Sequence, residues 1–226
     1  MNFLGLDPQD IAKNLYDFEQ PGATSFADVL SWELCQNIIK VSEAYRLLPG
    51  NGFVTPQRER GRVIQEMQIC YLERLLQVPP ELSSVIAPIA VELEKFFQRL
   101  RPYAEPLAGD LLRDTPLLGS SFNSIGIHYY PAQTGGITPH RDFASSLNLI
   151  IIFVLSGDAE LYICQNRKGE EAKKTICSPR SMVILRAPRN EAEQQYRPFH
   201  YLTSSSTDRY SLIFRQETGP SGAGYA

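Results

Sequence analysis

Two histidines and one aspartate are the residues of this chain best suited to bind a metal ion. His140 and Asp142 stand two positions apart, so on a β-strand their side chains would point to the same face and Arg141 to the other. The chain has only two other histidines that could supply a second imidazole, His128 and His200. His200 lies in a segment that resumes a strand pattern. Two imidazoles and a carboxylate on one side of a metal suit Fe(II) and leave three coordination positions for a bidentate ligand and oxygen. We therefore expect His140, Asp142 and His200 to form an iron site.

A candidate carboxylate-binding pair begins nine residues after His200. Arg209 and Ser211 have the same-face spacing of a strand. A guanidinium binds a carboxylate through two parallel, charge-assisted hydrogen bonds, and a serine hydroxyl adds a third donor. This pair suits the far carboxylate of a dicarboxylic keto acid.

The order and spacing of these residues resemble those of the Fe(II)/2-oxoglutarate-dependent dioxygenase superfamily. The shared pattern is His-x-Asp, a gap of fifty to sixty residues, a second His and, about ten residues later, Arg-x-Ser. The segment from Arg209 to Arg215 and the motif Tyr129-x-Pro131 also resemble the AlkB branch. Two positions depart from that branch, because Ala132 replaces its glycine and Ile127 replaces the asparagine before its tyrosine.

The resemblance covers about residues 121–217, with a weaker echo at residues 26–46, and it implies roles for individual residues. The implied metal ligands are His140, Asp142 and His200. The implied 2-oxoglutarate contacts are Arg209 and Ser211 on the far carboxylate, with Tyr129 and Arg215 nearer the keto-acid end.

The activity implied by the resemblance is that of an Fe(II)- and 2-oxoglutarate-dependent dioxygenase, an oxidoreductase that consumes O2 and releases succinate and CO2. Because Asp142 occupies the carboxylate position, the expected outcome is hydroxylation, or dealkylation triggered by hydroxylation. We expect a small-molecule substrate, such as an amino acid or a secondary metabolite. Two alternatives stay open: an AlkB-like oxidative dealkylase of nucleic acid, and a non-catalytic, cupin-like metal-binding module of the same fold.

No motif identifies the substrate, but basic residues are candidates for a polar contact with it. They are Arg58, Arg60, Arg62 and Arg141. The first three lie in or beside residues 50–62, whose content of Gly, Pro, Gln and charged residues predicts a surface loop. This loop could cover the substrate as a lid or serve as a plain connector.

Composition and charge narrow the class of protein. The 226 residues carry a formal net charge of −3, and the pI is about 5.7. This argues against a broad nucleic-acid-binding face, which is usually basic. No apolar run reaches membrane-spanning length, and the first residues lack the features of a leader peptide. The four cysteines show no paired spacing typical of a zinc cluster or disulfide framework. We expect a cytoplasmic protein without a membrane partner.

The pattern of elements predicts one α+β domain over residues 1–226. We expect a mainly helical elaboration at 1–118, a double-stranded β-helix (jelly roll) core at 119–217 and a disordered tail at 218–226. Core strands are expected at 123–130, 147–155, 161–164, 182–185 and 209–216. The apolar run at 149–154 would be buried on both faces, so helices should pack on one sheet.

Helices are expected in the N-terminal part at two places. Ser31 is a suitable N-cap for a helix that runs to about Leu47, after a strand at 26–30. A second helix should open at Pro80, be interrupted or restarted at Pro88, and end near Pro102. Its apolar stripe, Ile89, Leu93, Phe96 or Phe97, and Leu100, is expected to pack in the core.

Overall fold

The structure is a computed structural model that describes residues 6–16, 22–46, 54–59, 62–71, 80–108, 122, 124–142, 146–187 and 195–217. Its elements, in chain order, are α1 (Pro8–Tyr16), β1 (Ala23–Phe26), α2 (Trp32–Arg46), β2 (Val54–Glu59), β3 (Arg62–Tyr71), α3 (Pro80–Ala108), β4 (Ser124–Tyr130), β5 (Ile137–His140), β6 (Ser146–Val154), β7 (Leu161–Cys164), β8 (Lys173–Thr175), β9 (Met182–Arg186), β10 (Phe199–Leu202) and β11 (Arg209–Glu217). The predicted tail at 218–226 lies outside the described residues.

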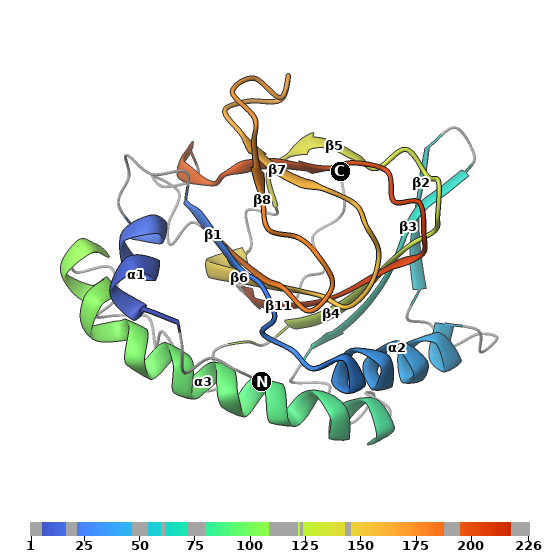
Figure 1. The fold of residues 1–226 in the computed structure, drawn as a ribbon, viewed down its shortest axis with the longest axis horizontal. Coiled ribbons are helices and arrows are strands. Elements are labelled where there is room, and N and C mark those ends of the chain that lie inside the picture. The colour runs from blue at the N-terminus through green and yellow to red at the C-terminus, as the bar shows by residue number, and fades with distance from the viewer. Residues whose placement is uncertain are drawn as a thin grey trace.

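Two antiparallel sheets curve around a common interior (Figure 1). The larger sheet has seven strands in the order β1-β9-β6-β11-β4-β3-β2, and the smaller has four in the order β5-β10-β7-β8. The three helices lie on the outer side of the larger sheet (Figure 1). This confirms the predicted α+β class, with a jelly-roll type of core and helices packed on one sheet. Among the described residues, no helix is both long enough and apolar enough to cross a membrane.

The core between α3 and the larger sheet is built from the predicted helical stripe. Ile89, Leu93, Phe96, Phe97 and Leu100 are all buried. They belong to one apolar cluster with Ile151, Phe153, Leu212 and Phe214 of the sheet. Burying one such side chain contributes about 1.5–3 kcal/mol to the free energy of unfolding. The cluster therefore fixes the sheet that carries β11 and β4 against a helical support.

Helix α3 differs from the expectation at its prolines. It continues through Pro88 and Pro102 to Ala108, and Figure 1 shows it bent along its length. Both prolines are exposed, so the carbonyls that lose their helical partners face water, which can bind them. Burial of the stripe offsets a cost of roughly 3 kcal/mol for each proline.

Two other N-terminal expectations have different outcomes. The N-cap is confirmed, because the Leu34 N–H donates to Ser31 Oγ at 3.2 Å. The strand expected at 26–30 is wrong, since β1 covers Ala23–Phe26 and the chain then bends at Asp28, whose φ is 56°. The N–H groups of Val29 and Leu30 donate instead to the Arg180 carbonyl.

The expected loop at 50–62 is also corrected by the structure. Residues 54–59 form β2, which pairs with β3, and β3 pairs with β4 of the core. The N-terminal part therefore adds three strands to the larger sheet, in addition to its three helices. Local composition cannot reveal this, because β4, which joins the β2–β3 pair to the sheet, lies far along the chain. Whether the segment acts as a lid stays a prediction.

The five predicted core strands are confirmed to within one residue at each end, as β4, β6, β7, β9 and β11. The short strand β8 carries no alternating apolar pattern and was not expected. Register then decides which side chains meet. In β11 and β4, Arg209 stands opposite Tyr130 and Ser211 opposite His128, and directly opposed residues share one face of a sheet.

Gly157, in the turn between β6 and β7, is required by the position of Arg209. Its φ is 93°, and a Cβ at this position would lie 2.5 Å from Arg209 Cβ. We expect Gly157→Ala to lower the free energy of unfolding by about 2–4 kcal/mol, because strain and overlap add. Chemical denaturation measures this. Gly135→Ala is the control, since nothing lies within 4 Å of its Cβ. Equal midpoints for the two variants would contradict the prediction.

Candidate active site

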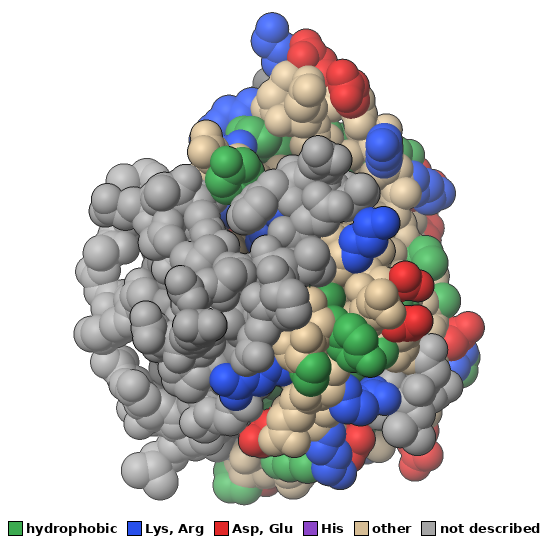
Figure 2. Space-filling model, turned by 90° about the vertical axis from the view of Figure 1, so that its left-hand side faces the viewer, with side chains coloured by type: hydrophobic (Ala, Val, Ile, Leu, Met, Phe, Trp, Pro, Cys, Tyr) green, Lys and Arg blue, Asp and Glu red, His purple; other side chains and the backbone are tan. Residues whose placement is uncertain are grey.

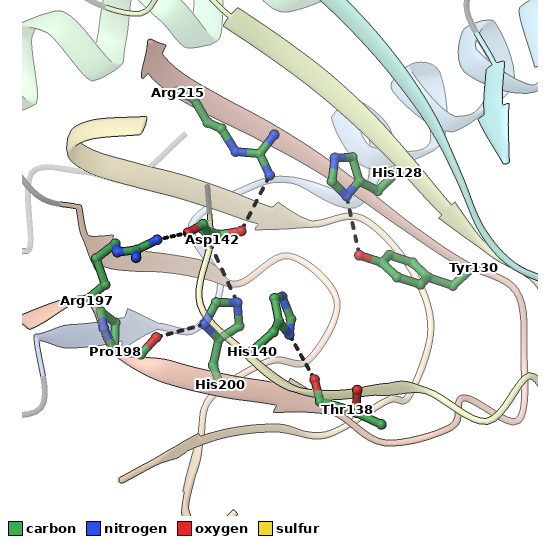
Figure 3. Close-up of polar contacts among 9 residues, drawn as sticks. All are labelled: His128, Tyr130, Thr138, His140, Asp142, Arg197, Pro198, His200 and Arg215. Carbon is green, nitrogen blue, oxygen red and sulfur yellow. Dashed lines mark hydrogen bonds and ion pairs between the residues drawn. The ribbon is translucent and has the colours of Figure 1, made fainter. Parts of the chain in front are cut away.

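His140, Asp142 and His200 come together at the inner side of the smaller sheet. His140 in β5 stands directly opposite His200 in β10, and their ring centroids are 4.4 Å apart. Asp142 Oδ2 lies 3.7 Å from His200 Nε2. One ligand atom from each of the three residues lies within 4.8 Å of the others (Figure 3). Small side-chain movements would bring these atoms to the distances of about 2.0–2.2 Å at which such ligands bind one metal ion.

Backbone carbonyls hold both imidazoles in the orientation that metal binding requires. His140 Nδ1 lies 2.9 Å from the Thr138 carbonyl, and His200 Nδ1 lies 3.2 Å from the Pro198 carbonyl. A carbonyl only accepts, so Nδ1 is the protonated nitrogen of each ring and Nε2 keeps its lone pair. At metal sites, a hydrogen bond from the ring nitrogen that does not bind the metal fixes the orientation of the imidazole.

Asp142 lies beyond the end of β5, so strand alternation does not place it. Instead, Arg197 Nη1 donates to the Asp142 backbone carbonyl, and Arg215 Nη2 lies 3.8 Å from Asp142 Oδ1. Figure 3 shows these two arginines on different sides of Asp142. The predicted grouping of His140 with Asp142 is thus present, but contacts outside the strand produce it.

Electrostatics favours an ionised Asp142 and a neutral His200. Burial by itself would raise the pKa of Asp142, but the neighbouring positive groups, Arg215 among them, outweigh it, and the pKa lies below its ordinary value. Burial lowers the pKa of His200, and the opposing effect of Asp142 is smaller. A carboxylate and a neutral imidazole are the forms that bind metal ions.

A cavity of about 330 Å³ is lined by the three candidate metal ligands and by the predicted carboxylate-binding pair, Arg209 and Ser211. Arg209 is 2% exposed, Arg215 is 4% exposed, and Ser211 is fully buried. Arg209 Nη2 donates to Cys177 Sγ at 3.2 Å. Among the described residues, Arg209 Nε and Ser211 Oγ have no hydrogen-bond partner. Buried donors without a partner are rare, so their presence in a cavity indicates a polar ligand.

Tyr129 does not line this cavity, and its predicted co-substrate contact is wrong. Its hydroxyl donates to Asp208 Oδ2 at 3.1 Å, and its ring packs against Tyr210 under the Arg46 guanidinium. Tyr129 stands opposite Tyr210 on β11, which places both on the face away from Arg209. The cavity is lined instead by Tyr130.

His128 is a cavity residue that sequence reasoning left out. It lines the cavity, and its Nδ1 lies 3.4 Å from the Tyr130 hydroxyl (Figure 3). Strand spacing is the sequence feature that could have identified it. His128 and Tyr130 lie two positions apart and share one face of the sheet with Ser211 and Arg209, which stand opposite them on β11. The adjacent pair Tyr129-Tyr130 made the choice of face ambiguous without the register.

Arg141 is the one substrate candidate that the structure places at the site. It lines the cavity, its Nη2 donates to the Gln195 carbonyl at 2.8 Å, and its guanidinium lies 4.1 Å from the centre of the Phe199 ring. The side chains of Arg58 and Arg62, and the whole of Arg60, lie outside the described part of the chain.

His128 should give the protein a measurable pH dependence. Burial first, and then Arg215, hold the pKa of His128 well below its ordinary value of 6.5. The unfolded chain therefore binds this proton more readily, and the free energy of unfolding falls as the pH decreases below 6.5. The expected slope is at most about 1.4 kcal/mol per pH unit. Denaturation at several pH values should show a smaller loss in His128→Gln. Equal losses in the two proteins would contradict this.

Comparison with known proteins finds similarity at the level of structure. No protein-family model and no curated protein matches the sequence. A protein described as an oxygenase from Shewanella oneidensis superposes with a TM-score of 0.63 at 17% identity, over 93% of this chain and 87% of its own. JOX2, solved with 2OG, Fe and JA, gives a TM-score of 0.62 at 16% identity, over 92% of this chain and 70% of its own.

A prolyl hydroxylase from Trichoplax adhaerens, in complex with a peptide of hypoxia-inducible factor, also matches. Its TM-score is 0.55 at 13% identity, over 93% of this chain and 90% of its own. This chain has the fold of these oxygenases. Identity this low carries no residue-by-residue assignment, so the chemistry must be argued from the side chains in the cavity.

Proposed function

We propose that this chain is an Fe(II)- and 2-oxoglutarate-dependent dioxygenase that hydroxylates a small molecule. One observation carries the proposal: the His140–Asp142–His200 group shares a cavity with the buried Arg209–Ser211 pair. A metal site alone would need no carboxylate-binding pair, so the combination favours an enzyme over a non-catalytic metal-binding module. The fold of the oxygenases described above is consistent with this reading.

The residues present fit both groups. His140 and His200 would bind iron through Nε2, and Asp142 through its carboxylate. Arg209 and Ser211 offer buried donors that lack partners among the described residues, which suits the far carboxylate of 2-oxoglutarate. Iron and 2-oxoglutarate together supply the activation of O2, with succinate and CO2 as products, which side chains cannot provide.

The protein's own part in the reaction is to orient these groups and exclude water. Arg215 lies on β11 with Arg209 and Ser211, and its Nη2 is 3.8 Å from Asp142 Oδ1, so it helps to keep Asp142 ionised and adds positive charge for the near end of the keto acid. Tyr130 and His128 supply neutral hydrogen-bonding groups from β4. Burial raises the pKa of Tyr130 to about 12, so its hydroxyl stays a donor.

The substrate class is inferred from size and charge. A cavity of about 330 Å³ is near the lower end of the roughly 300–1,000 Å³ typical of ligand sites, and 2-oxoglutarate would take part of it. On the face in Figure 2, basic and acidic side chains are interspersed over the described residues, and the chain carries a formal net charge of −3, whereas nucleic-acid-binding proteins usually have a basic face. Both points favour a small molecule over an alkylated nucleic acid.

The proposal is tested by anaerobic titration of metal-free protein with Fe(II) and then 2-oxoglutarate. We expect the weak visible charge-transfer band of a keto acid chelated to iron, and its loss in His140→Ala. With O2 and 2-oxoglutarate, succinate should form. Protein that folds normally but shows no band would support the non-catalytic metal-binding module instead.

The neighbouring tyrosines provide a matched pair for the co-substrate contact. Tyr130→Phe removes a hydroxyl from the cavity and should raise the half-saturating 2-oxoglutarate concentration about threefold to tenfold. Tyr129→Phe removes a hydroxyl that binds Asp208 on the other face and should leave that concentration unchanged. The same anaerobic titration measures both. A larger effect from Tyr129→Phe would restore the original assignment.

A further inference from the structure

The cavity is lined by one arginine that the proposed co-substrate does not need, Arg141. Arg141 is half-buried and lines the cavity, whereas Arg209 and Arg215 are almost fully buried. Arg141 therefore lies where the cavity meets solvent. Its position is constrained by the Phe199 ring and the Gln195 carbonyl, so its guanidinium is held in place before any ligand arrives.

Two more arginines lie close enough to influence Arg141. Burial first, and then the positive charges of Arg197 and Arg167, lower the pKa of Arg141. Arg167 belongs to the turn between β7 and β8, a hairpin that projects beyond the sheets in Figure 1. Arg197 is anchored through the Asp142 carbonyl. We refer to Arg141, Arg167 and Arg197 as the arginine cluster.

No carboxylate of the described residues balances the charge at Arg141. Within the described part of the chain, the charged groups that influence it are arginines. Arg141 Nε, moreover, is buried and has no hydrogen-bond partner among the described residues. Like charges held together repel one another, and an anion placed between them removes the repulsion.

The deeper part of the cavity cannot supply that anion. With Fe(II) and the dianion of 2-oxoglutarate in place, the buried groups Asp142, Arg209 and Arg215 leave the interior with a net positive charge. Arg141 adds positive charge at the opening, with Arg167 and Arg197 near it. An incoming ligand with a negative charge is therefore favoured over a neutral or cationic one.

We propose that the substrate oxidised at this site is a small organic carboxylate, whose carboxylate group binds Arg141 within the arginine cluster. This inference rests on the proposed function and narrows it, because it selects acids over amides, esters and amines of the same shape. The planar guanidinium of Arg141 can form the paired hydrogen bonds that a carboxylate accepts. Since Arg141 adjoins the metal ligands His140 and Asp142 in sequence, a carboxylate bound to it would set a short chain beside the metal.

The test is a binding measurement that does not require knowledge of the true substrate. Protein loaded with Mn(II) and saturating 2-oxoglutarate is titrated with acetate, hexanoate and benzoate, and with the corresponding amides, by ligand-observed NMR. At least one acid should bind about tenfold or more tightly than its amide. Arg141→Gln should remove this preference. Arg101→Gln, the same change of charge on an exposed residue of α3, should retain it.

A second pair of variants avoids the neighbourhood of the metal ligands. Arg167→Gln should weaken binding of the preferred acid about twofold to fivefold, while Lys168→Gln, its neighbour in the same turn, should not. The inference is overturned if no acid is preferred, if Arg141→Gln binds the acid as tightly as the native protein, or if 2-oxoglutarate displaces the acid. The anaerobic charge-transfer band tests the proposed function separately. If the band forms but no acid is preferred, only the inference is contradicted. If the band does not form, the proposed function itself is contradicted.

Discussion

Replacing Arg209 by glutamine is expected to raise the 2-oxoglutarate concentration for half-saturation about 100-fold or more. The guanidinium is 2% exposed, and its Nε has no partner among the described residues. It would make charge-assisted bonds to the far carboxylate in the buried part of the cavity. Two such bonds are together worth roughly 3 kcal/mol or more. The measurement is the anaerobic titration of the iron-loaded protein with 2-oxoglutarate, followed by the charge-transfer band.

The controls for Arg209 separate a binding role from a structural one. Arg101→Gln removes the same charge from an exposed position of α3 and should titrate like the native protein. Arg209→Met should bind 2-oxoglutarate as poorly as the glutamine variant, but its ligand-free form should not unfold at a lower temperature, because a buried cation without a carboxylate partner contributes little to stability. A large drop in Tm together with normal 2-oxoglutarate binding would show that Arg209 serves the fold.

Replacing any one of His140, Asp142 and His200 by alanine is expected to abolish the thermal stabilisation of the protein by a divalent metal. Mn(II) at about 100 times its dissociation constant should stabilise the native protein by about 2.7 kcal/mol. For a chain of this size, that corresponds to an increase in Tm of roughly 5–10 °C. Each alanine removes one of three ligands from a site whose ligand atoms lie within 4.8 Å of one another. Thermal unfolding with and without Mn(II) measures the shift.

His128→Gln is the matched control for the metal site. It removes the third histidine of the chain from the same cavity, but His128 is not part of the metal-binding group. The variant should therefore keep the full increase in Tm with Mn(II), whatever its stability without metal. A shift lost in His128→Gln and kept in His200→Ala would show that the metal ligands were assigned to the wrong histidines.

Side-chain chemistry and short-range spacing were sufficient for much of this site. His140 and Asp142 are neighbours in sequence, and the three-histidine count left few choices for the second imidazole. Arg209 and Ser211 were placed on one face by strand alternation, which depends only on backbone geometry. The five core strands and the buried stripe of α3 were predictable for the same reason, because burial imposes a period on the local sequence.

Register and long-range pairing decided the rest. Tyr129 and Tyr130 are alike in chemistry, and only the alignment of β4 with β11 shows that Tyr130 shares the face of Arg209. A shift of one residue would reverse that choice. The same holds for β2 and β3, whose place in the larger sheet depends on the hydrogen bonds of β4. The arginine cluster likewise joins residues from three separate segments. Its members are brought together by the pairing of β10 with β5 and β7, which no local sequence pattern specifies.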